Sequence, residues 1–94
     1  MHFSLIIPSY NNAGELIQEL PPLLRHLSSR GFHAEPIIVN DGSSHADSLS
    51  RFCAEHGFTL LHHKENQGKG AAVRTGMLHA TREVRIFKIG RAHV

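Results

Sequence analysis

Short apolar runs alternate with amphipathic segments along this chain, and this alternation limits its fold more than any other feature. Four runs have the length and the apolar character of buried strands: residues 3–8, 36–40, 58–63 and 83–87. Three segments between them have helical character: residues 16–27, 45–56 and 70–80. Strands that alternate with helices predict an α/β fold, in which a Rossmann-like, mostly parallel sheet carries helices on both faces.

Proline and capping residues set the expected ends of these elements. Pro8 is expected to end the first strand, and Asn12 with Glu15 is expected to form a capping box on the first helix. Pro21-Pro22 predicts a kink or a split in that helix, because proline removes a helical hydrogen bond. Ser44 is the expected cap of the second helix.

Length and composition bound what the chain can be. Its 94 residues suffice for one small domain, and 40% of them are apolar. A formal charge of +2 without a basic run gives no reason to expect a nucleic-acid partner. Cys53 is the only cysteine, and no stretch approaches the roughly 20 apolar residues of a membrane span. We therefore expect a cytoplasmic protein, and membrane association of a longer parent stays open.

Polar loops follow the first three strands. Ligands of parallel sheets bind beyond the carboxyl ends of the strands, so residues 8–12, 41–44 and 64–70 should converge on one edge. Tyr10 has a ring that can stack on a nucleobase or a ribose. Asp41 offers a charged acceptor to a base N–H or a ribose hydroxyl, a contact worth about 1.5–3 kcal/mol.

The third of these loops has the features of an anion site. Gly68 and Gly70 let the backbone approach a ligand closely, and Lys69 at a helix start favours a diphosphate. The glycine spacing fits neither a Walker loop nor a dinucleotide fingerprint. Each loop also has a purely structural interpretation: Asn12 as a cap, residues 41–44 as an Asx turn, and Lys69 as an exposed lysine.

Nine histidines raise the question of a metal site. His62 and His63 are adjacent on an expected strand, so their side chains should point to opposite faces of the sheet. No histidine pair has helical ligand spacing beside a carboxylate. We therefore interpret the histidines as scattered surface residues.

Taken in order, the three loop motifs carry a resemblance. Residues 6–11 (IIPSYN), 38–44 (IVNDGSS) and 66–76 (NQGKGAAVRTG) closely resemble the family 2 glycosyltransferases, and the resemblance covers about residues 2–87. The last motif looks most like enzymes that move a sugar from a nucleotide onto a polyprenyl phosphate. The fold that this resemblance implies is the N-terminal, nucleotide-binding half of a GT-A type glycosyltransferase, and it suggests an inverting reaction.

The resemblance also implies a nucleotide-sugar site made of Pro8, Tyr10, Asn12, Val39, Asp41, Lys69 and Arg74. The first four would line the nucleotide pocket, and Asp41 would hold the base or the ribose. Lys69 and Arg74 would lie near the diphosphate. Many members of the family carry Glu where this chain has Asn12. This chain therefore lacks a charged acceptor at that position.

The family's metal motif is missing where it should follow. An Asp-x-Asp after the fourth strand would hold Mg²⁺ or Mn²⁺ on the diphosphate, but residues 88–94 contain no carboxylate. They can be encoded by AAG ATC GGA AGA GCA CAC GTC, which resembles a common sequencing adapter. We therefore interpret residues 1–87 as a truncated domain and 88–94 as a non-native tail. The chain alone is expected to bind no metal, to be inactive, and to expose a sheet edge.

The leading hypothesis is sugar transfer from a nucleotide-sugar donor to an acceptor, with polyprenyl phosphate as the candidate acceptor. Two hypotheses from other classes stay open. One is a non-catalytic nucleotide-binding module in which residues 88–94 are native. The other is a small flavodoxin-like or regulatory domain whose loops are only turns. The absence of nucleotide binding by the intact parent, together with no loss on Asp41→Ala, would favour it.

Overall fold

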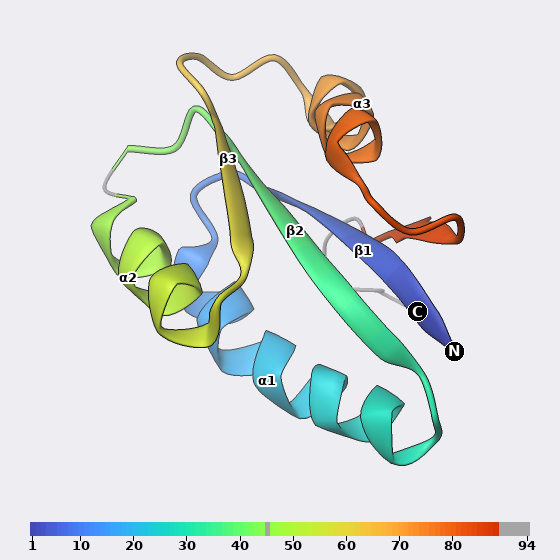
Figure 1. Cartoon of the computed structure of the whole chain (residues 1–94). Coiled ribbons are helices and arrows are strands. Elements are labelled where there is room, and N and C mark those ends of the chain that lie inside the picture. The colour runs from blue at the N-terminus through green and yellow to red at the C-terminus, as the bar shows by residue number, and fades with distance from the viewer. Residues whose placement is uncertain (45, 89–94) are drawn as a thin grey trace, which may run out of the picture.

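Strands and helices follow one another in strict alternation in the computed structural model, which describes residues 1–44 and 46–88. The elements are β1 (His2–Ser9), α1 (Ala13–Ser29), β2 (His33–Asp41), α2 (Asp47–His56), β3 (Thr59–His63), α3 (Lys69–His79) and β4 (Arg85–Phe87). All strand pairs are parallel, and the sheet order is β3-β2-β1-β4 (Figure 1). The predicted α/β fold with a parallel sheet is confirmed.

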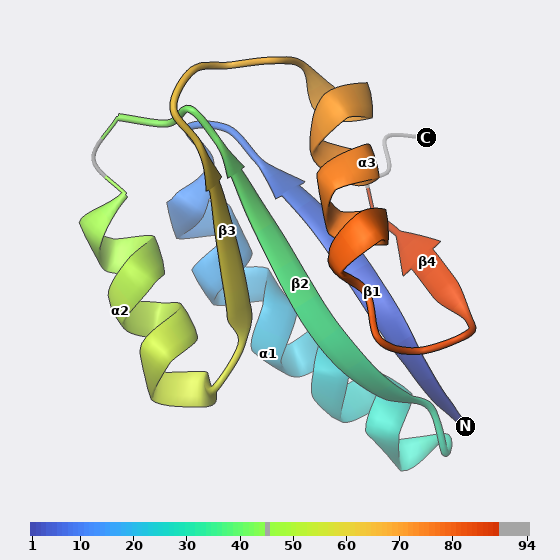
Figure 2. The same cartoon turned by 45° about the horizontal axis from the view of Figure 1, so that its top comes forward.

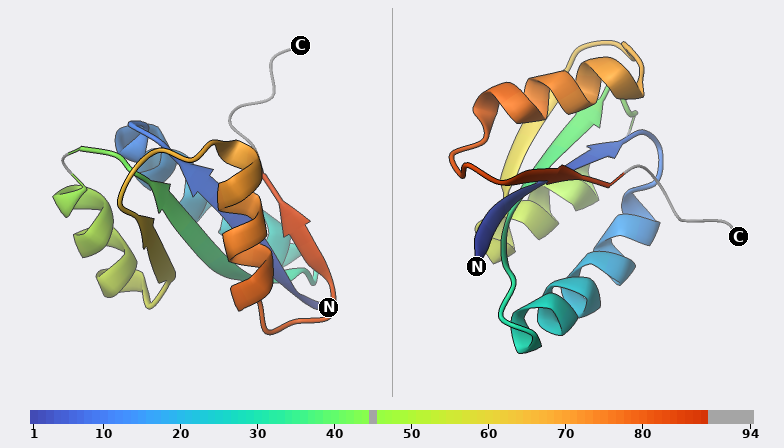
Figure 3. Two further views of the ribbon diagram at one scale, coloured as in Figure 1. Left: turned by 90° about the horizontal axis from the view of Figure 1, so that it is seen from above. Right: turned by 90° about the vertical axis from the view of Figure 1, so that its right-hand side faces the viewer.

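Helices cover both faces of this sheet, as the alternation predicts. Helices α1 and α2 lie on one face and α3 lies on the other (Figure 3). Successive β1 residues serve opposite faces: Leu5 and Ile7 join the larger core under α1 and α2, whereas Ile6 packs on the α3 side. Ile6 is 0% exposed, and burying a side chain of this size contributes about 1.5–3 kcal/mol.

Pro8 does not end the first strand, contrary to the prediction. Strand β1 continues to Ser9, and Pro8 keeps its place opposite Val39 of β2. Ser4 and Ile6 direct their backbone groups to the β4 side, where they bond Val84 and Lys88. Backbone groups alternate in direction along a strand, and Pro8 is two residues after Ile6, so the ring nitrogen of Pro8 also faces the β4 side. It lies beyond the end of β4, and the missing N–H therefore costs no hydrogen bond between β1 and β2.

Pro21 and Pro22 do not split the first helix. Helix α1 is one element of 17 residues with both prolines inside it. It ends at Ser29, and Gly31 just beyond its C-cap has a φ of 84° and donates its N–H to the Ser28 carbonyl. The next N–H, of Phe32, donates to the Leu27 carbonyl, which completes a Schellman motif.

The predicted side-chain caps are wrong. Asn12 is the residue before α1, but its Oδ1 accepts hydrogen bonds from Ser9 Oγ at 2.7 Å and from Tyr10 N at 3.1 Å instead of capping. Helix α2 begins at Asp47, and Ala46 precedes it without a side-chain cap, so Ser44 does not have the predicted role. At Asn12, hydrogen bonds within its own loop take the side chain away from the cap position.

Strand β4 is the least buried part of the sheet. It has three residues, all exposed, and Ile86 and Phe87 are 46% and 50% exposed. It lies on the open edge of the sheet beside β1 (Figure 3). The expected exposed sheet edge is therefore present. The proposed non-native tail, apart from Lys88, lies outside the described residues.

Candidate functional site

The loops that follow β1, β2 and β3 meet at the carboxyl edge of the sheet, as predicted (Figure 2). The first two are joined by a hydrogen bond from Asn11 N to Ser43 Oγ at 2.8 Å. The second and third touch at Gly42, where a Cβ atom would lie 2.4 Å from the backbone nitrogen of Asn66. The glycine is therefore what allows the two loops to approach each other so closely.

The carboxylate of Asp41 is the centre of this arrangement. It is 3% exposed, and its Oδ1 accepts hydrogen bonds from Gln67 N at 2.9 Å and from His63 Nδ1 at 2.8 Å. Its Oδ2 accepts one from Gly68 N at 3.0 Å. A carboxylate has about four acceptor positions, and these three bonds occupy three of them, so one position on Oδ2 remains.

Hydrogen bonding sets the charge state of Asp41. Burial alone would raise the pKa of this carboxyl, but the bonds from Gln67 N, His63 and Gly68 N outweigh burial and lower it. The group is therefore ionised at neutral pH. It anchors the loop before α3 through a fixed negative charge. Asn40, rather than Asp41, makes the Asx turn here, through Ser43 N at 3.0 Å.

His63 is the site residue that sequence analysis missed. Its side chain is 9% exposed, so the interpretation as a surface histidine is wrong for this residue. Besides Asp41, it contacts Thr75 of α3, with 2.8 Å between Nε2 and Oγ1. The available signal was register: at the ends of neighbouring parallel strands, Asp41 and His63 are direct partners. His62 points the other way, to Asn40 at 3.2 Å, as strand alternation predicts.

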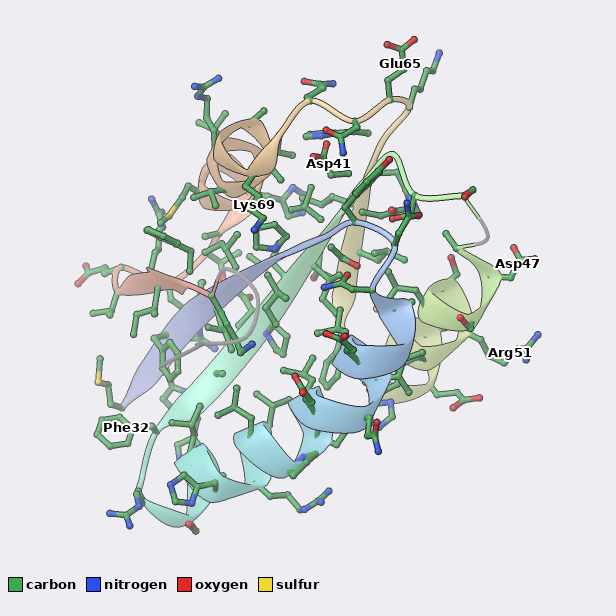
Figure 4. The ribbon with its side chains drawn as sticks, turned by 180° about the vertical axis from the view of Figure 1, so that it is seen from behind. Phe32, Asp41, Asp47, Arg51, Glu65 and Lys69 are labelled. Carbon is green, nitrogen blue, oxygen red and sulfur yellow. The ribbon has the colours of Figure 1, made fainter. Side chains whose placement is uncertain are left out.

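The two predicted cations lie on different sides of α3. Lys69 starts the helix, three and seven residues before the buried Ala72 and Gly76, so it shares their sheet-facing side. Arg74 falls on the opposite side and is exposed. Figure 4 shows Lys69 and Asp41 at the same end of the molecule, far from Phe32. The structure thus brings Lys69, but not Arg74, to the carboxyl edge.

The four residues expected to line the nucleotide pocket, Pro8, Tyr10, Asn12 and Val39, differ in exposure and in hydrogen bonding. Tyr10 is 51% exposed and free to meet a planar ligand, whereas Asn12 is occupied by bonds within its own loop. Pro8 and Val39 are neighbours across β1 and β2. Val39 is 0% exposed, so it supports the site from below and offers no side-chain surface to a ligand.

A hollow of about 220 Å³ opens beside these loops. It lies where α1 and α2 begin and is lined by Asn11, Ala13, Ser43, Ser44, Ala46 and Leu49. Small-molecule pockets usually measure about 300–1,000 Å³. The hollow is therefore too small to enclose a complete nucleotide sugar. We call the carboxyl edge of the sheet with its three loops (residues 10–12, 42–44 and 64–68) the platform.

Residues 1–44 and 46–88 contain neither a cluster of metal ligands nor an apolar helix of membrane-spanning length. This part of the chain holds no group of three or more His, Cys, Asp or Glu side chains that is placed to bind a metal ion. The donor set of the described loops thus does not fit a Mg²⁺ or Mn²⁺ site by itself. Within the same ranges, no helix is both long and apolar enough to cross a membrane.

Comparison with known proteins identifies the family. Residues 4–87 match the family model described as glycosyl transferase family 2. Dolichyl-phosphate beta-glucosyltransferase of Saccharomyces cerevisiae is 32% identical over 95 residues, which covers 89% of this chain and 28% of the yeast protein. The Drosophila melanogaster enzyme of the same name is 36% identical, with 85% of this chain and 28% of that protein covered. The chain thus spans a little over a quarter of these relatives.

A solved structure has the same fold. The mannosyltransferase PcManGT from Pyrobaculum calidifontis, in complex with GDP-Man and Mn²⁺, superposes with a TM-score of 0.75. The match covers 93% of this chain and 26% of that one, at 23% identity. At this identity the match establishes the fold, including its GT-A character, and leaves ligand contacts to be argued from the residues of this chain.

Proposed function

The chain belongs to glycosyltransferase family 2, and on that basis we propose that it is the donor-binding part of an enzyme that transfers a sugar from a nucleotide sugar to a polyprenyl phosphate. The observation that carries the proposal is the carboxyl-edge platform, where the ionised Asp41 and the start of α3 are held together. Similar proteins named as dolichyl-phosphate glucosyltransferases support the acceptor class.

The platform offers complementary groups to the two ends of a nucleotide diphosphate. The remaining acceptor position on Asp41 Oδ2 suits a base N–H or a ribose hydroxyl, and the exposed ring of Tyr10 suits stacking. The first amide groups of α3 and the Lys69 ammonium suit the diphosphate. Pro8 and Val39 stiffen the strands beneath the platform, and Arg74 would act on the diphosphate only if the ligand passes over the outer side of α3.

The reaction itself needs groups besides these. An acceptor phosphate oxygen attacks the anomeric carbon, the bond from that carbon to the diphosphate breaks, and the nucleoside diphosphate leaves with the electron pair. In this proposal the described residues bind and orient the donor, and they hold no cluster of metal ligands. A Mg²⁺ or Mn²⁺ ion would neutralise the charge that develops on the departing diphosphate.

The test begins with the source gene. The DNA is sequenced past the Phe87 codon, and the complete open frame is expressed and assayed with polyprenyl phosphate and either UDP-glucose or GDP-mannose. We expect transfer from one donor and its loss on Asp41→Ala. Nucleotide binding without any transfer would favour the non-catalytic module instead. An open frame that ends at Val94 would remove the enzyme proposal for this protein.

A further inference from the structure

His63 connects three pieces of the platform through one ring, which is 9% exposed. Its Nδ1 lies 2.8 Å from Asp41 Oδ1, and its Nε2 lies 2.8 Å from Thr75 Oγ1. Asp41 in turn holds the backbone amides of Gln67 and Gly68. We call this set of five residues the Asp41 clamp. It joins the end of β2, the end of β3 and the second turn of α3.

Proton counting shows that both ring nitrogens of His63 have a suitable partner in the clamp. Ionised Asp41 can only accept, so Nδ1 of His63 must carry a proton. Thr75 Oγ1 also lies 3.0 Å from the Ala71 carbonyl, which can only accept as well. With a neutral ring, the Thr75 hydroxyl donates to Nε2. With a protonated ring, Nε2 donates to Thr75, whose proton turns to Ala71. His63 therefore keeps both partners in either charge state.

We propose that His63 is a positioning residue for the nucleotide site, because it aims the Asp41 carboxylate and ties that carboxylate to the helix that carries Lys69. The inference rests on the proposed function, since it assumes a nucleotide diphosphate on the platform. Without the Nδ1 bond, Asp41 would keep only the two loop amides and could rotate toward them. The free acceptor position on Oδ2 would then no longer point in a fixed direction.

Two substitutions of the ring separate its two bonds. His63→Asn places an N–H near the position of Nδ1 and so retains the bond to Asp41, whereas His63→Gln places its amide near Nε2 and retains only the bond to Thr75. Thr75→Val keeps the shape of the threonine and removes its hydroxyl. The three variants and the wild-type chain of 94 residues are titrated with UDP and GDP by ¹H–¹⁵N NMR, and their amide exchange is followed at Gln67 and Gly68.

We expect His63→Gln to weaken binding of the preferred nucleotide about tenfold and to speed amide exchange at Gln67 and Gly68, since one charge-assisted bond is lost. His63→Asn should stay within about threefold of the wild type. Thr75→Val should weaken diphosphate binding more than binding of the bare nucleoside, because it loosens α3 and leaves Asp41 in place. All variants are compared at a temperature at which circular dichroism shows them folded.

Two outcomes would overturn the positioning role while leaving the proposed function intact. In the first, His63→Gln binds nucleotide as well as the wild type does. In the second, His63→Asn loses as much affinity as His63→Gln, which would mean that the volume of the ring matters and its bond to Asp41 does not. A wild-type chain that binds neither UDP nor GDP would instead refute nucleotide binding itself, and the role of His63 would fall with it.

Discussion

Replacing Gly42 by alanine should destabilise the protein through a contact between two loops. Gly42 has a φ of 78°, a left-handed conformation that costs a residue with a side chain about 1–2 kcal/mol. A Cβ atom there would also lie 2.4 Å from Asn66 N and 2.5 Å from the carbonyl carbon of Glu65. Both are backbone atoms, so no side-chain rotation can relieve the clash. Overpacking of this kind costs about 1–3 kcal/mol.

Gly57→Ala is the matched control, because it isolates the conformational part of the cost. Gly57 has a φ of 70°, and a Cβ atom at that position would meet nothing within 4 Å. The two substitutions therefore share the left-handed penalty and differ in the loop contact. We expect Gly57→Ala to cost about 1–2 kcal/mol and Gly42→Ala about 2–5 kcal/mol in free energy of unfolding.

Urea denaturation followed by far-UV circular dichroism measures both costs. For a domain of 60–100 residues, 1 kcal/mol corresponds to roughly 4–8 °C in Tm, so thermal unfolding should separate the variants clearly. The Gln67 and Gly68 amide signals should move in Gly42→Ala and stay unchanged in Gly57→Ala, because the displaced loop carries the two donors to Asp41. Equal destabilisation by the two substitutions would refute the argument that these loops are in contact.

Three further predictions test the packing and the charges around the platform. Gly76→Ala should destabilise by about 1–2 kcal/mol, since its Cβ would lie 2.4 Å from Ile6 Cγ2, whereas Gly70→Ala in the same helix has open space and should be neutral or stabilising in urea denaturation. Because the pKa of Asp41 is lowered, its stabilising contribution is complete above the unfolded-state pKa and is lost as the pH falls through the folded-state pKa. The difference in free energy of unfolding between wild type and Asp41→Asn, measured from pH 7 to pH 2, should therefore shrink toward acid. A difference that stays constant would contradict the ionised clamp. Lys69→Ala should weaken binding of nucleoside diphosphates in calorimetry and leave the bare nucleoside unaffected, so an equal loss for both would exclude a contact with the diphosphate.

Much of the fold could be predicted from the sequence because the signals were periodic and repeated. Strands of continuous apolar residues and helices with apolar stripes gave the correct order of elements, and parallel pairing followed from that order. The errors lie where a single residue was expected to decide. Pro8 sits in a strand because its nitrogen faces away from β2. Pro21-Pro22 does not split α1, and Leu16 and Leu20 of that helix pack in the core; the predicted kink stays a prediction.

The site was predictable as a place but only partly as a set of contacts. The rule that loops converge at the carboxyl edge gave Asp41 and Lys69, because it depends only on topology. It could not show that Asp41 spends three of its acceptor positions within the protein, since that depends on how residues 64–68 fold back over β2. His63 was missed for a related reason. Its role depends on the residue opposite it in the neighbouring strand, and the register of β2 and β3 is set by the tertiary structure. A carboxylate and a histidine that end two neighbouring parallel strands in register therefore indicate a partly buried pair, as Asp41 and His63 form here.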